Sequence, residues 1–178
     1  MLVSLLAQAV ALFLVWLLLH AARHKLLSDN QHYYENLMQN YAYVPRSLQG
    51  IATVRAIAAG EILIALGLLL PFSKTLAAIA CALLMLVYGA LLSAQWLQGK
   101  RDMDCGCSGP AVALKISPAL LWRNLVLALL ALFAASEPYV MAAELWLALA
   151  LAIVFSLAYS CWEGLLANAQ RIEAMRSR

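Results

Sequence analysis

Long apolar segments, separated by short polar stretches, dominate the hydrophobic pattern of this chain. They cover residues 2–22, 51–70, 75–97, 116–136 and 139–162. Each is close to the roughly 20 residues that an α-helix needs to cross a hydrocarbon core about 30 Å thick. Backbone groups in lipid must be hydrogen-bonded within the segment, as they are in an α-helix. The pattern therefore predicts an all-α, polytopic membrane helix bundle of about five transmembrane helices, forming one integral membrane domain over residues 1–178.

The composition agrees with this prediction. Of the 178 residues, 65% are hydrophobic and 12% are charged, and the mean hydropathy is +0.83. Soluble domains have roughly 45–50% apolar and about 25% charged residues, so the composition excludes an ordinary soluble protein. The net charge of +3 is small, and four cysteines are too few and too scattered for a disulfide scaffold.

The basic residues predict how the bundle is oriented. Five spans place the two termini on opposite sides of the membrane. If the N-terminus lies outside, nine basic residues of the loops and tail face the cytoplasm and only Lys74 lies outside. The nine are Arg23, Lys25, Arg46, Lys100, Arg101, Lys115, Arg171, Arg176 and Arg178. Positive charge collects on the cytoplasmic side of membrane proteins. The pattern thus places the C-terminus and the loop of residues 98–116 in the cytoplasm.

The stretch "SDNQHYYENLMQNYAYVPRSLQG" joins the first two spans. Tyr33, Leu37, Met38 and Tyr41 recur in it at helical spacing, and Pro45 ends the pattern. We expect a short amphipathic helix in the membrane interface, with its tyrosines at headgroup level. An irregular loop is the alternative.

Two cysteines separated by one glycine lie in the third loop, in "KRDMDCGCSG". Cys105 and Cys107 can form a disulfide only through a tight turn, for which Gly106 supplies the permissive φ. Strained disulfides exchange readily with other thiols. Nearby bases would favour a thiolate and nearby acids would oppose it; these are Lys100, Arg101, Asp102 and Asp104. A redox pair is the preferred interpretation.

Other roles for the cysteines stay open at this point. Two thiolates also suit a soft metal ion such as Cu(I) or Zn, with a histidine as a further ligand. The candidates on the same side are His20, His24 and His32. Cys161 is either a resolving thiol, a third ligand or a packing residue, and Cys81 is expected to pack in the third span.

Glu61 is an ionisable group near the middle of the second span. Such groups are costly in lipid and are functional candidates by default. Glu61 could carry protons, or it could hold helices together in a buried ion pair. Arg55 does not share its helical face; Arg123, followed by Asn124, is a candidate partner across the bundle.

Several of these features together resemble one protein family. "DCGCSG" is followed, after a short gap, by "ISPALLWRN" at the start of the next span. "HKL" ends the first span, Tyr41 or Tyr43 precedes Pro45, and Glu61 lies in "GEILIALGLLLP". From about residue 10 to 136 the sequence resembles the methylamine utilisation MauE family, which is related to DoxX-type redox membrane proteins.

The resemblance implies a maturation role rather than a metabolic reaction. MauE proteins are needed to produce the small, disulfide-rich β-subunit of methylamine dehydrogenase, beside the membrane-anchored thioredoxin-like protein MauD. The resemblance therefore implies a thiol–disulfide component of a bacterial inner membrane, with a MauD-like protein as partner and the β-subunit as client. Membrane lipid is the remaining partner; neither nucleic acid nor a cofactor or resident metal is expected.

The expected site contains Cys105 and Cys107 as the redox pair, Glu61 in a proton or ion-pair role, and Arg123 with Asn124. The client is periplasmic, however, whereas the charges place the cysteine loop in the cytoplasm. Either the orientation is wrong, or electrons cross the membrane, or the cysteines only tune assembly. A metal-binding or transport protein and a passive docking scaffold are the alternative functions.

Overall fold

The computed structural model describes residues 2–41, 44–100, 102–107, 109–112, 114–137 and 144–176. Within these ranges the chain is helical apart from turns and one loop, which confirms the all-α class. The α-helices are α1 (Leu2–Leu26), α2 (Gln31–Asn40), α3 (Ile51–Leu69), α4 (Lys74–Leu97), α5 (Pro118–Ser136) and α6 (Leu145–Arg176). Short 3-10 helices occupy Ser28–Asn30, Arg46–Leu48 and Pro110–Val112.

Five of these helices are long and apolar enough to cross a membrane, namely α1, α3, α4, α5 and α6. The protein is thus a multi-pass membrane protein, and four of the predicted spans match their helices closely. The fifth prediction differs: α6 continues to Arg176 instead of ending at residue 162, and residues 139–143 lie outside the described part. No proline interrupts the sequence after residue 162, so the helix outlasts its apolar run.

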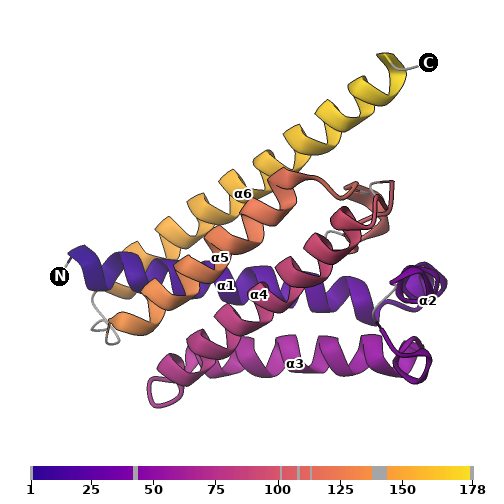
Figure 1. The fold of residues 1–178 in the computed structure, drawn as a ribbon. Helices are drawn as coiled ribbons and strands as arrows, with labels where there is room; N and C mark the ends of the chain where they lie inside the picture. The colour runs from indigo at the N-terminus through magenta and orange to yellow at the C-terminus, as the bar shows by residue number, and fades with distance from the viewer. Residues whose placement is uncertain are drawn as a thin grey trace.

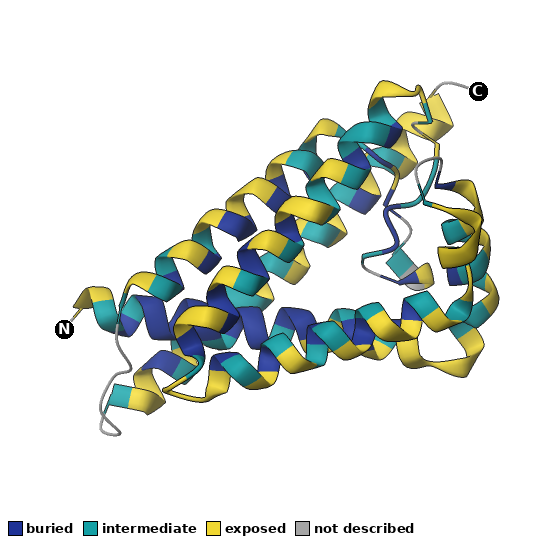
Figure 2. Cartoon of the chain, turned by 60° about the horizontal axis from the view of Figure 1, so that its bottom comes forward, coloured by how far each residue is buried: buried dark blue, intermediate teal, exposed yellow. Residues whose placement is uncertain are grey.

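Helix α1 is the centre of the bundle. It packs against α3, α5 and α6, while α4 packs on α3 and α5. Residues 7–11 of α1 are all buried. This run is longer than one turn of about 3.6 residues, so α1 is surrounded by protein on every side there. The other helices each have exposed positions on their outward faces (Figure 2). Apolar side chains such as Leu63 and Leu76 are among the exposed ones. Lipid would cover these faces.

One end of the bundle holds the functional candidates. The two termini lie at opposite ends, and α2 runs across the same end as the loop that joins α4 to α5 (Figure 1). That loop is packed rather than extended. Its residues Cys105, Leu114 and Ile116 form a small buried cluster with Leu92 and Leu120 from the adjacent helix ends.

Candidate functional site

The cysteine loop has a defined backbone that brings its two thiols together. Cys105 donates its backbone N–H to the Leu114 carbonyl at 2.8 Å, and Ile116 donates to the Met103 carbonyl at 3.0 Å. Gly106 has φ +74°, the left-handed conformation predicted for it. The Sγ atoms of the free cysteines, Cys105 and Cys107, lie 2.7 Å apart. A disulfide needs about 2.05 Å, so a small movement of the sulfurs brings them to bonding distance.

The two thiols differ in exposure. Cys105 is buried, with 6% of its surface exposed, whereas Cys107 is half-buried. A partner molecule therefore reaches Cys107 more easily than Cys105.

Helix α2 holds the cysteine loop in place. The Tyr34 hydroxyl donates to the Gly106 carbonyl at 3.3 Å, and the Tyr41 hydroxyl lies 3.5 Å from the Cys105 carbonyl. Leu37 lies against the α-carbon of Gly106. The predicted helix is confirmed, and part of its apolar face packs on the cysteine loop. Tyr34, which the sequence pattern did not single out, is its most buried residue, and Tyr43 lies outside the described residues.

Gly106→Ala should disrupt this arrangement. The backbone at this position has a positive φ, which is unfavourable for alanine. The added methyl group would also overlap the Leu37 side chain. We expect the free energy of unfolding to fall by about 1–3 kcal/mol, measured as thermal or denaturant unfolding of the purified protein in detergent. Gly164→Ala is the control, because that helical position has open space and should gain roughly 0.5–1 kcal/mol. Equal stability of the two variants would contradict the packing described.

Arg123 reaches the cysteine pair from α5. One guanidinium nitrogen lies 3.5 Å from Cys105 Sγ, and another donates to Glu163 Oε1 at 2.7 Å. The Tyr159 hydroxyl donates to the same carboxylate oxygen at 2.8 Å. Glu163 and Tyr159 belong to α6, so this helix helps to fix the charge beside the thiols. The amide of Asn124 bonds to the Leu120 carbonyl of its own helix.

Glu61 has a different partner from the one predicted. Lys25 of α1 donates to both of its carboxylate oxygens, at 2.7 and 3.0 Å, and the Tyr88 hydroxyl donates to Oε1 at 2.6 Å. Glu61 is fully buried. The prediction of Arg123 as the partner is wrong, because Arg123 is taken up by Glu163. Lys25 lies 36 residues before Glu61, and the sequence pattern indicates only that it is a charge at the cytoplasmic end of its span.

The surroundings of the two thiols shift their pKa values in opposite directions. The hydrogen bond from the Cys105 thiol lowers the pKa of Cys107, and the charges of Arg123 and Lys25 lower it further against the opposing effect of burial. The same hydrogen bond, with burial, raises the pKa of Cys105. Cys107 is thus the more acidic thiol of the pair.

The bases of the cysteine loop are placed differently from the prediction. Lys100 donates to the Asn40 carbonyl, and Lys115 pairs with Asp102 at 2.8 Å. Arg101 lies outside the described residues. Arg123 and Lys25, distant in sequence from the cysteines, supply the charges that favour the thiolate.

Alkylation of Cys107 should reflect this acidity. Iodoacetamide reacts with the thiolate, so the rate should reach its plateau at lower pH than for an ordinary thiol of pKa about 8.5. The double variant Arg123→Gln, Glu163→Gln removes the cation without leaving an unpaired carboxylate, and should move the profile to higher pH. Mass spectrometry of the Cys107 peptide measures the rate. An unchanged pH profile in the double variant would contradict the role of Arg123.

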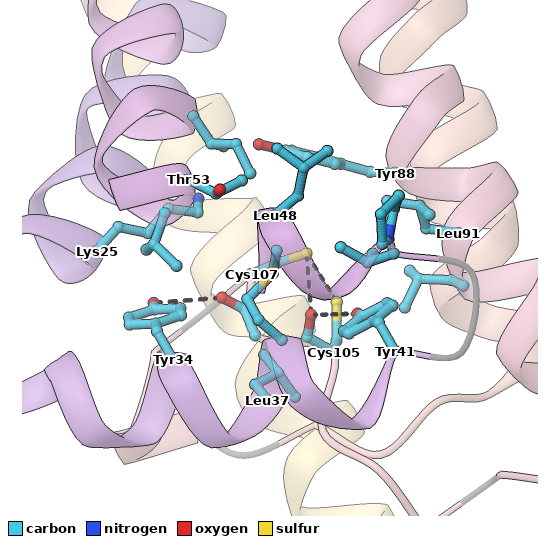
Figure 3. A pocket seen from close by; sticks show the side chains of 17 residues that line it. Lys25, Tyr34, Leu37, Tyr41, Leu48, Thr53, Tyr88, Leu91, Cys105 and Cys107 are labelled. Carbon is cyan, nitrogen blue, oxygen red and sulfur yellow. Dashed lines mark hydrogen bonds between the residues drawn. The ribbon is translucent and has the colours of Figure 1, made fainter. Parts of the chain in front are cut away.

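Two cavities meet at Cys107. The larger, 280 Å³ in volume, lies between α2, the start of α3, the end of α4 and the cysteine loop (Figure 3). The smaller, of 30 Å³, lies among Glu61, Arg123, Asn124 and Tyr159. About 10–15 Å³ is enough for one water molecule, so the smaller cavity can hold one or two. Lys25, Tyr88 and Cys107 line both.

The other candidate residues lie outside this arrangement. His24 bonds to His20 at 3.2 Å and its ring lies against Gly109, while the His32 side chain is 97% exposed. Among the described residues, no group of three His, Cys, Asp or Glu side chains is placed to hold a metal ion. Cys81 is buried in the core, as predicted, and Cys161 is exposed on α6.

The fold and the site together define a class: a multi-pass helical membrane protein with a close cysteine pair in a packed loop at one end. The sequence profile of the family "Methylamine utilisation protein MauE" matches residues 3–137. The chain belongs to this family, as the resemblance implied.

Two curated relatives support the assignment. The methylamine utilization protein MauE of Paracoccus denitrificans is 33% identical over 124 residues, covering 70% of this chain and 65% of the relative. That of Paracoccus versutus is 31% identical over 128 residues, covering 72% of this chain and 67% of the relative. The chain thus spans about two thirds of the length of either relative. No solved structure matches.

The matched region contains the cysteine pair, Lys25, Glu61 and Arg123. It ends before α6, which contributes Glu163 and Tyr159. The ion pair on α6 is therefore part of the site in this chain although the family profile does not extend to it.

Proposed function

We propose that this protein is a membrane thiol–disulfide redox component that supports maturation of the disulfide-rich small subunit of methylamine dehydrogenase. A membrane-bound, thioredoxin-like protein of the MauD type is its proposed partner. The observation that carries the proposal is the cysteine pair itself: two thiols 2.7 Å apart, one buried and one half-buried. Family membership supplies the link to methylamine utilisation.

The different surroundings of the two thiols support distinct steps in exchange. In the oxidised protein, a thiolate of the partner attacks Cys107 Sγ, the Cys105–Cys107 bond breaks, and Cys105 leaves as a thiolate. The Arg123 guanidinium, 3.5 Å from Cys105 Sγ, stabilises that leaving group. A second partner thiolate then attacks its own sulfur bonded to Cys107 and releases the Cys107 thiolate. The partner gains a disulfide, and the pair is reduced.

Glu61 is proposed to take part in moving the protons of this cycle. The reduced pair binds protons that the oxidised pair does not. The small cavity connects Cys107 to the group formed by Glu61, Lys25 and Tyr88, and it is wide enough for water. A carboxylate at this depth, already held by an ammonium and a hydroxyl, can receive a proton without moving far.

The cysteine loop is proposed to face the cytoplasm, because positive charge collects at its end of the bundle. In intact cells, Cys107 should then react with a membrane-permeant maleimide and resist an impermeant one. Cys105 should show the same sidedness but react more slowly, because it is buried. Labelling of Cys107 by the impermeant reagent would reverse the orientation, and the loop would then face the periplasmic client directly.

A complementation experiment tests the proposed function. A host that lacks its own MauE, grown on another carbon source with methylamine added, should contain little of the small subunit, and expression of the wild-type chain should restore it with correct disulfides. Cys105→Ser with Cys107→Ser should fail to restore it, although the variant accumulates in the membrane. Full restoration by the double variant would leave a docking scaffold as the function.

A further inference from the structure

An apolar cavity next to a redox-active pair needs an explanation that exchange with a protein partner does not provide. We infer that the 280 Å³ cavity binds the head group of a membrane quinone, which removes two electrons from the Cys105–Cys107 dithiol. This inference rests on the proposed redox function and adds the terminal oxidant to it.

The size and lining of the cavity fit a single substituted ring. Its volume of 280 Å³ is near the lower end of small-molecule pockets, which are roughly 300–1,000 Å³. Its lining is mainly aliphatic and aromatic, including Leu37, Ile57 and Leu91 from three different helices. Both cysteines belong to the wall, so a bound ring would lie against the half-buried Cys107 sulfur (Figure 3).

A few polar groups are placed to meet the carbonyl oxygens of a quinone. Lys25 lines the cavity and donates two hydrogen bonds to the Glu61 carboxylate. An ammonium has three donors; among the described residues Glu61 accepts two as hydrogen bonds, and the Tyr88 ring lies 5.7 Å from Nζ. Thr53 lines the same cavity with a hydroxyl group, whereas the Tyr88 hydroxyl already donates to Glu61. One neutralised ammonium and one hydroxyl group suit an uncharged carbonyl compound better than a nucleotide, whose phosphates would require further cations.

The position of the cavity suits a ligand that arrives from the lipid. Its wall includes Val54 and Ile57 of α3 and Leu91 of α4, and both helices are membrane spans. Leu48 at the margin of the cavity is 50% exposed. A quinone with an isoprenoid tail dissolves in the bilayer and can insert its ring between these helices.

The reaction balances without another reactant. The two thiols of Cys105 and Cys107 lose two protons and two electrons as the S–S bond forms. The quinone gains both electrons, and two protons give its oxygens the O–H bonds of the hydroquinone. Membrane quinones act as the oxidant of thiol systems in the bacterial periplasm. The direction of transfer is thus from the thiols of the exchange partner to the pair and then to the quinone.

The test uses the full chain in lipid nanodiscs, reduced and freed of reductant under anaerobic conditions, with decylubiquinone as the probe. Quinone absorbance and free thiols are followed together. We expect one quinone to be reduced for each pair of thiols lost. Ile57→Trp, which fills the cavity, should slow this reaction at least about tenfold. Leu63→Trp, on the lipid-facing side of the same helix and 69% exposed, should leave the rate unchanged.

Oxidation by diamide separates the two levels of the proposal. If diamide forms the Cys105–Cys107 disulfide but decylubiquinone does not, the quinone inference is overturned and the exchange function stands; a lipid chain would then be the occupant. If neither oxidant closes the pair, the exchange function fails as well. A wild-type rate in Ile57→Trp also overturns the inference.

An azidoquinone supplies a test without variants: it should crosslink to the peptides of residues 48–57 or 88–92, and labelling elsewhere only would contradict the site.

Discussion

Cells that express Cys105→Ser are expected to accumulate this protein in mixed disulfides with its proposed thioredoxin-like partner. Cys107 is the accessible thiol and the more acidic one, so it forms the bond to the partner. Cys105 is the only described thiol placed to release that bond, because its sulfur lies 2.7 Å from Cys107 Sγ. In Cys105→Ser, Cys107 can still attack an oxidised partner, which is the reverse of the proposed exchange, and then only the partner's own second thiol can release the mixed disulfide. Non-reducing electrophoresis of acid-quenched membranes, with mass spectrometry of the adduct, measures the result.

The matched control is Cys107→Ser. It should form few mixed disulfides, because burial keeps the remaining Cys105 thiol away from partners and raises its pKa. Both single variants should lose function completely. Cys81→Ser and Cys161→Ser should behave like the wild type. Equal adduct formation by the two single variants, or adducts only in Cys107→Ser, would show that the roles assigned to the thiols are wrong.

Glu61→Gln is expected to have the second large effect. The change removes the carboxylate from Lys25, and a buried ion pair that loses one partner typically costs about 3–5 kcal/mol. It also removes the proposed proton acceptor beside Cys107. We therefore expect both a lower free energy of unfolding and loss of small-subunit maturation, measured by thermal unfolding of purified protein and by immunoblot of the client.

A charge-neutral double variant separates these two effects. Lys25→Met with Glu61→Gln removes both charges, and such replacements are often neutral for stability. If Glu61 handles protons, the double variant should regain stability and still fail in maturation. Recovery of maturation together with stability would show that the ion pair is structural only.

Most of the fold could be predicted because lipid imposes one rule on the whole chain. Each span must be helical and about 20 residues long, so apolar length alone located α1, α3, α4 and α5. The same rule failed for α6, where the helix continues for 14 residues beyond residue 162. Hydropathy indicates where the apolar surface ends, whereas helix propensity decides where the helix ends. Beyond residue 162 the chain is rich in residues with high helix propensity, such as Ala, Leu, Glu and Arg.

The site was predictable where its signal was local. Cys105, Gly106 and Cys107 are adjacent in sequence, and Gly106 adopts the expected positive φ. Pairings between helices left no such signal. Nothing near Glu61 in the sequence indicates Lys25, 36 residues earlier, and nothing near Arg123 indicates Glu163, 40 residues later. An unpaired charge within a span predicts that a partner exists, but only the packing of the helices selects it.

The redox state of the pair in its native membrane tests the central proposal most directly. Membranes are acid-quenched, free thiols are blocked, disulfides are reduced, and the released thiols are tagged with a mass-shifting maleimide. We predict that Cys105 and Cys107 gain the tag together in the wild type, with the Cys105–Cys107 bond identified by peptide mapping, and that the tagged fraction changes when the thioredoxin-like partner is deleted. A pair that stays fully reduced with and without the partner would contradict a thiol–disulfide function.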